Sequence, residues 1–189
     1  MSFWKDVSFP NTRRFLSDSV TSVMPKRTAE NLFLKLFSWR KIPLPYFVNP
    51  SIEELSDEAV VCKIPLRRAT KNHLNSMYFG ALAAGADLAA GLAAMAFIRE
   101  SGKPISLIFK DIKGDFLKRA ESDVYFSCDQ IPDIKRLVQK TARSSERQNL
   151  SVHVCCYVLE DGIKVEVATF VLTLSLKQKV TQARKEAVT

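Results

Sequence analysis

The chain has 189 residues, of which 47% are hydrophobic and 25% charged, and its formal net charge is +8. These are the proportions of a globular domain with a buried core, so they exclude intrinsic disorder, a collagen-like repeat and a disulfide-dense mini-protein. The excess positive charge lies at the two ends: residues 1–50 carry a net +5, residues 175–189 carry +3, and the middle is neutral. A neutral middle argues against a nucleic-acid partner. Attraction of the ends to phosphate-bearing ligands or to an anionic membrane surface stays open, beside plain solubility.

Motifs for nucleotides and metals are missing from the sequence. The six glycines form no Gly-x-Gly-x-x-Gly pattern, and Ala86 and Asp87 stand where a P-loop needs Lys and Ser or Thr. The four cysteines form no Cys-x-x-Cys pair and there are only two histidines, so we expect no metal site. The first residues lack the apolar segment of a signal peptide, which favours free thiols and a cytoplasmic protein.

The chain begins with a basic segment that reads as a helical extension. Four apolar residues at helical spacing predict an amphipathic helix over 28–39: Leu32, Phe33, Leu36 and Phe37. The prolines that follow, from Pro43 to Pro50, predict extended chain. We expect this helix to cover the core, and membrane-surface contact is the less favoured alternative. The expected organisation is an extension over 1–45, a domain over 46–176 and a basic tail over 177–189.

A strand over 59–66 and a polar loop over 67–79 precede an unusual segment. Residues 80–98 include nine alanines and carry a single charge, Asp87. The segment is close to the roughly 20 residues that cross a bilayer. However, its side chains are small and a central carboxylate is costly in hydrocarbon, so we expect a helix enclosed by its own protein. Small side chains also let a sheet approach the helix axis closely.

Five further elements complete the chain: strands over 104–112 and 120–129, a helix over 132–143, and strands over 150–159 and 163–176. The helix has its apolar stripe at Ile134, Leu137, Val138 and Thr141. Asp161 and Gly162 between the last two strands predict a tight hairpin. One long helix followed by mostly antiparallel strands predicts an α+β fold, in which a curved antiparallel sheet wraps around a central Ala-rich helix.

Residues 72–87, NHLNSMYFGALAAGAD, resemble the signature of the PaaI-like hotdog thioesterases. That signature has an Asn, a Gly, then His-Gly-Gly, an apolar run and an Asp. Asn72, Gly80 and Asp87 match it without a gap. Three positions depart from it, because Asn75 replaces the earlier Gly and Tyr78 and Phe79 replace the His and the Gly after it. The basic extension and the helix over 132–143 look more like an uncharacterised bacterial branch of the superfamily (YiiD C-terminal-like).

The resemblance implies a hotdog fold and hydrolysis of acyl thioesters, commonly of coenzyme A, with no cofactor beyond that part of the substrate. In this reading Asp87 activates water and Asn72 orients the water or the substrate. Backbone N–H groups at Gly80, at the helix start, stabilise the oxyanion. The neighbouring residues expected to contact the substrate are His73, Asn75, Tyr78 and Phe79.

Helix geometry then predicts an oligomer. Gly80 and Asp87 are seven residues apart, about 10 Å along a helix, too far to act on one carbonyl within one chain. A working site would combine the helix start of one subunit with Asp87 of another, in a homodimer or a dimer of dimers. A catalytically silent hotdog that binds acyl groups or a protein partner is the alternative. A hotdog hydratase or dehydratase is less favoured, because no histidine lies near Asp87.

Overall fold

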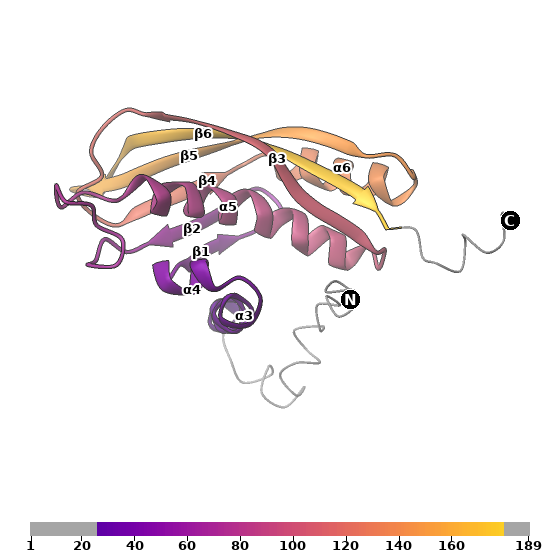
Figure 1. The fold of residues 1–189 in the computed structure, drawn as a ribbon, viewed down its shortest axis with the longest axis horizontal. Helices are drawn as coiled ribbons and strands as arrows, with labels where there is room; N and C mark the ends of the chain where they lie inside the picture. Colours follow the sequence, from indigo (N-terminus) through magenta and orange to yellow (C-terminus); the bar gives the residue numbers. More distant parts are fainter. Residues whose placement is uncertain (1–25, 180–189) are drawn as a thin grey trace, which may run out of the picture.

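Six strands form one antiparallel sheet in the order β1-β2-β4-β5-β6-β3, and the sheet curves around the long helix α5 (Figure 1). The computed structural model describes residues 26–179. Residues 1–25 of the predicted extension over 1–45 and residues 180–189 of the predicted tail over 177–189 lie outside the described residues. In chain order the elements are α3 (Lys26–Lys41), α4 (Pro43–Val48), β1 (Ser51–Leu55), β2 (Val60–Ile64), α5 (Phe79–Glu100), β3 (Ile105–Phe116), β4 (Val124–Cys128), α6 (Ile131–Ala142), β5 (Gln148–Glu160) and β6 (Ile163–Gln178).

Helix α5 is the core of the molecule, as the alanine-rich segment predicts. Eleven of its residues are buried, among them Ala86, Ala89 and Ala90. By length and composition it could cross a membrane, alone among the helices described here, but most of it is buried inside the protein. A Cβ added at Gly85 would lie only 2.3 Å from the ring of Phe126 in β4, so the glycine lets helix and sheet approach closely. The predicted α+β hotdog architecture is therefore confirmed.

The elements that follow α5 also agree with the sequence pattern. All four stripe residues predicted for α6 are buried, and they pack beside α5, β5 and β6. Strands β5 and β6 form a long hairpin whose turn contains Asp161 at φ 50° and Gly162 at φ 82°. Two successive positive φ angles are typical of the tight turn that Asp-Gly predicts.

The region before the sheet differs from expectation. Pro43 begins the short helix α4 where extended chain was predicted, because proline is well tolerated in the first turn of a helix. Strand β1 was not predicted, since Glu53 and Glu54 interrupt its apolar pattern. The buried side of α3 also differs: Leu34 is 1% exposed, while Leu36, on the predicted stripe, is 38% exposed.

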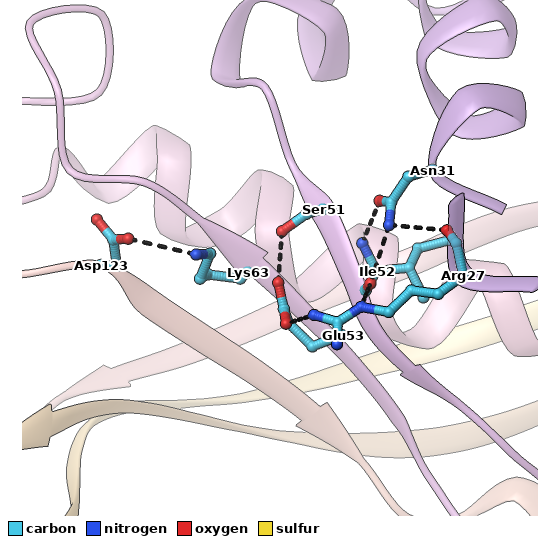
Figure 2. Close-up of polar contacts among 7 residues, drawn as sticks. All are labelled: Arg27, Asn31, Ser51, Ile52, Glu53, Lys63 and Asp123. Carbon is cyan, nitrogen blue, oxygen red and sulfur yellow. Dashed lines mark hydrogen bonds and ion pairs between the residues drawn. The ribbon is translucent and has the colours of Figure 1, made fainter. Parts of the chain in front are cut away.

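Helix α3 is fixed to the edge strand β1 by polar contacts (Figure 2). The side chain of Asn31 donates to the Ile52 carbonyl oxygen at 3.1 Å and accepts from the Ile52 N–H at 2.7 Å, so it pairs like another strand. Arg27 also donates to the Ile52 carbonyl oxygen and forms an ion pair with Glu53. These contacts hold α3 and α4 beside α5, on the side away from β5 and β6 in the view of Figure 1.

The opposite end of the sheet is formed by β3, whose outer edge has no neighbouring strand among residues 26–179. Its register against β6 shifts between Phe109 and Ile112, which marks a bulge. Ile108, Ile112 and Phe116 are each half exposed or more. A twelve-residue edge strand with exposed apolar side chains is a template for pairing with another chain.

Candidate active site at the central helix

The loop before α5 is built around Asn72. Its side-chain amide donates to the hydroxyl of Ser76 at 3.0 Å, and its side-chain oxygen accepts the N–H groups of Leu74 and Ser76 at 2.9 and 3.2 Å. The backbone of Asn72 also donates to the Ser76 carbonyl oxygen. These bonds hold the loop together, and they use the side-chain oxygen of Asn72 and one of its two amide N–H groups.

Asn75 and His73 lie at the exposed tip of this loop. Asn75 has φ 63°, a left-handed conformation that favours Gly and is tolerated best by Asn among the other residues. This explains physically why Asn can stand at a position where the resembled signature has Gly. The side chain of His73 is exposed. In the sequence, His73 lies 14 residues before Asp87.

The first turn of α5 offers unpaired backbone donors. The N–H groups of Ala81 and Leu82 both donate to the Tyr78 carbonyl oxygen, at 2.9 and 3.2 Å. Those of Phe79 and Gly80 donate to no acceptor among residues 26–179, and Tyr78 at the N-cap provides no side-chain bond. Such orphan N–H groups at the positive end of the helix dipole are suited to an oxyanion.

Two aromatic rings surround these donors. Tyr78 and Phe79 are 47% and 60% exposed, and their ring centroids are 4.6 Å apart. The Tyr78 ring lies over Gly80, since a Cβ added there would be 2.6 Å from its Cε1 atom. A small residue is therefore required at position 80 while the ring stays in place, and the two rings form the entrance to the helix start.

Asp87 lies two turns further along α5 and is half-buried. It lines a cavity of about 80 Å³ and also a more open groove of about 320 Å³ beside β3. Burial raises the pKa of its carboxyl group above the ordinary value, and no charged group among the described residues offsets that shift. A carboxylate without an ion-pair partner, at the junction of a cavity and a groove, is suited to accept a proton from water.

The structure thus groups the predicted residues into two sets. Asn72, Asn75, Tyr78, Phe79 and Gly80 gather at the start of α5, with His73 on the same loop. Asp87 is separated from them by seven positions of helix, about 10 Å. Within one chain the donors and the carboxylate do not meet.

The helix over 28–39 was predicted and corresponds to α3, but Ser38 on that helix was not among the predicted site residues. Ser38 is only 2% exposed and lines the cavity together with Asp87. The available signal was its spacing of four from Leu34, which puts both on one side of α3. The more hydrophobic stripe through Leu36 obscured that signal.

The cysteines and His153 line neither the cavity nor the groove at Asp87. Burial raises the pKa of Cys62 to about 12 and that of Cys128 to about 11, so these thiols carry little nucleophilic thiolate at neutral pH. Cys156 is also buried, with its pKa raised by burial. His153 is exposed on β5, and its backbone N–H donates to the side chain of Gln130 at 2.6 Å.

Comparisons with known proteins agree with this architecture. Residues 30–174 match the family described as a domain of unknown function, DUF4442. A search of curated proteins finds no match. Among solved structures, a protein of unknown function from Chlorobaculum tepidum is similar at TM-score 0.69 and 13% identity, covering 81% of this chain and 97% of its own.

Two further solved structures carry a functional description. A Pseudomonas aeruginosa protein of unknown function, described as a probable thioesterase, has TM-score 0.64 and 22% identity, covering 82% of this chain and 99% of its own. A thioesterase family protein from Silicibacter pomeroyi has TM-score 0.59 and 20% identity, covering 79% and 99%. At these identities the likeness establishes a shared fold.

Proposed function

The chain belongs to the DUF4442 family, a domain of unknown function. From its fold and the position of Asp87 we propose that it hydrolyses an acyl thioester, such as an acyl-coenzyme A, at a site shared by two copies of the chain. The observation that carries the proposal is the half-buried Asp87, which lines both a cavity and a groove and whose pKa is raised by burial. Similar folds described as thioesterases support the choice of substrate class.

The free N–H groups of Phe79 and Gly80 act as the oxyanion donors in this proposal. As water attacks the thioester carbonyl, negative charge develops on its oxygen, and preorganised donors stabilise that charge. Loss of one such donor costs about 3–4 kcal/mol of transition-state stabilisation in enzymes of this kind. The positive end of the α5 dipole adds to the effect.

Asp87 of the partner subunit accepts the proton of the attacking water. The carboxylate takes a proton from the water as the water oxygen adds to the carbonyl carbon. The tetrahedral intermediate then collapses with cleavage of its C–S bond, and the protonated Asp87 gives its proton to the leaving thiolate, which departs as the free thiol. Because about 10 Å separates the donors from Asp87 in one chain, the reaction requires a second copy. The exposed edge of β3, next to the groove that Asp87 lines, is the surface proposed for that contact.

Release of free thiol from a panel of acyl-coenzyme A esters tests the proposal. Replacing the base with Asp87→Asn should reduce kcat by about 10²–10⁴-fold, the usual contribution of a positioned base. Asp57→Asn, which removes an exposed carboxylate from a loop, is the matched control and should leave the rate unchanged. Equal rates for wild type and Asp87→Asn would remove Asp87 from the mechanism.

A second candidate is an acyl-binding protein without catalysis. Tyr78 and Phe79 favour it, because their rings crowd the donors at the helix start and replace the His and the Gly of the resembled signature. This candidate predicts acyl-coenzyme A binding in calorimetry with no thiol released by the wild type. A hydratase is not proposed, since no histidine among residues 26–179 lines the cavity or the groove at Asp87.

A further inference from the structure

The cavity of about 80 Å³ lies between α5 and the helices α3 and α4. Its walls are almost entirely apolar, with residues such as Leu34, Met95 and Phe109. Only two polar side chains line it, Asp87 and Ser38. An apolar chamber with a carboxylate in its wall is suited to a ligand with an apolar body and one polar reacting end.

The α5 wall of this cavity follows one side of the helix. Asp87, Gly91 and Met95 are spaced four residues apart, so they lie on one face and extend over about 12 Å. The missing side chain at Gly91 leaves room, because a Cβ there would lie 3.8 Å from the Phe109 ring. A chain whose carbonyl group lies at Asp87 can therefore continue beside Gly91 toward Met95.

The opposite wall comes from α3 and is held firmly in place. Leu34, Ser38 and Ile42 recur at a spacing of four, and Asn31 precedes them on the same side of the helix. Asn31 is the residue whose side chain pairs with both backbone groups of Ile52 (Figure 2). The contact with β1 thus sets how closely this wall approaches α5.

We propose that this cavity receives the acyl group of the substrate and that α3 closes it, so that the protein selects short acyl chains. This inference rests on the proposed thioesterase function. A volume of about 80 Å³ has room for a short acyl group, whereas a long chain would have to displace α3. Displacement is costly because Leu34 is fully buried and Asn31 is bonded to the edge strand.

Chain-length profiles of two variants test the selection. Ile42→Ala widens the cavity, and because Ile42 is 47% exposed its truncation leaves the fold intact. Gly91→Ala narrows it by one methyl group that makes only ordinary contact with Phe109. The substrates are acetyl-, butyryl-, hexanoyl-, octanoyl- and palmitoyl-coenzyme A, and the readout is kcat/KM for each.

The wild type should prefer the short esters and reject palmitoyl-coenzyme A. For the shortest ester that the wild type rejects, Ile42→Ala should raise kcat/KM by about 10-fold or more. For the longest ester that the wild type accepts, Gly91→Ala should lower kcat/KM by a similar factor. This is the usual range for one methylene group. Leu44→Ala, an exposed residue of α4 outside the cavity, is the matched control and should leave the profile unchanged.

Failure of this inference differs from failure of the proposed function. Two results would overturn the inference and leave the thioesterase proposal standing. One is that all three variants turn over the esters with the chain-length profile of the wild type. The other is that the wild type turns over palmitoyl-coenzyme A faster than the short esters. Absence of thiol release from every ester overturns the thioesterase proposal instead. In that case calorimetric binding of the same esters decides the inference: a shift of the preferred length in Ile42→Ala supports it, and an unchanged preference overturns it.

Discussion

Asp87 places a carboxyl group in an apolar cavity wall, and no charged group among the described residues offsets the effect of burial on its pKa. Burial raises its pKa, so the folded state holds the proton more tightly than the unfolded chain. Stability from the neutral form is complete below the ordinary Asp pKa, roughly pH 4, and is lost as pH rises through the raised folded pKa. We therefore expect Asp87→Asn to be more stable than the wild type at neutral pH.

Urea unfolding of both proteins over a range of pH measures this effect. The difference in unfolding free energy should grow from near zero in acid to its full value above the folded pKa. Asp57→Asn, which removes an exposed carboxylate, is the matched control. A difference that falls with rising pH would mean that the Asp87 carboxylate is stabilised in the fold.

In the proposed mechanism the rate of thiol release should rise with pH as Asp87 loses its proton, because the base must be ionised.

For individual residues, the sequence allowed candidate side chains to be predicted better than the hydrogen bonds and contacts that those side chains form. A lone charge in an alanine-rich helix was enough to single out Asp87. The role of Asn72 could not be predicted, because its bonds to Ser76 and Leu74 depend on a loop conformation that spacing does not reveal. Ser38 was missed because its spacing of four from Leu34 is a weaker signal than the apolar stripe through Leu36, and the opposing wall of the cavity is not visible in the sequence.

Gly85 and Gly91 of helix α5 have different packing environments. A Cβ at Gly85 would meet the Phe126 ring, which is fully buried and cannot move aside. Gly85→Ala should therefore lower the free energy of unfolding by about 1–3 kcal/mol, the usual cost of overpacking. Gly91→Ala meets only ordinary contacts and should raise it by about 0.5–1 kcal/mol, since alanine favours helix.

Thermal and urea unfolding of the two variants measures the contrast directly. Each variant adds the same methyl group to the same helix, so the difference between them isolates the contact with β4. Equal stabilities would show that Phe126 gives way or that helix and sheet lie further apart than the structure has them.

Among the elements, those with regular apolar periodicity were predicted and those fixed by tertiary contacts were not. The alanine-rich helix and the β5–β6 hairpin agree with their patterns. Strand β1, with two glutamates in five residues, is stabilised by pairing with β2 and by Asn31 of α3, neither of which is visible in its own sequence. The buried face of α3 likewise depends on its contact with β1 and α5.

For the whole molecule, the proposed mechanism depends on a second copy, because about 10 Å of helix separates the donors from Asp87, and β3 is suited to form that contact. Antiparallel pairing of two β3 strands about Ile112 places Asp111 opposite the partner's Lys113, and Lys113 opposite the partner's Asp111. Opposite charges in such cross-strand positions are favourable by about 0.2–1 kcal/mol each. The same contact covers Ile112 and the groove beside Asp87.

A substitution at the centre of this contact tests the dependence of activity on the dimer. In the proposed pairing Ile112 would meet its own copy at the two-fold axis, so Ile112→Asp would bring two carboxylates together and should give a monomer in light scattering. Ile163→Asp makes the same change at a more exposed position near the β5–β6 turn and should leave the dimer intact.

Because each proposed site needs two copies, thiol release should fall with the dimer fraction in Ile112→Asp and on dilution of the wild type. A monomeric Ile112→Asp that retains full activity would show that one chain completes the site, and the pairing of helix start and carboxylate across subunits would then be wrong.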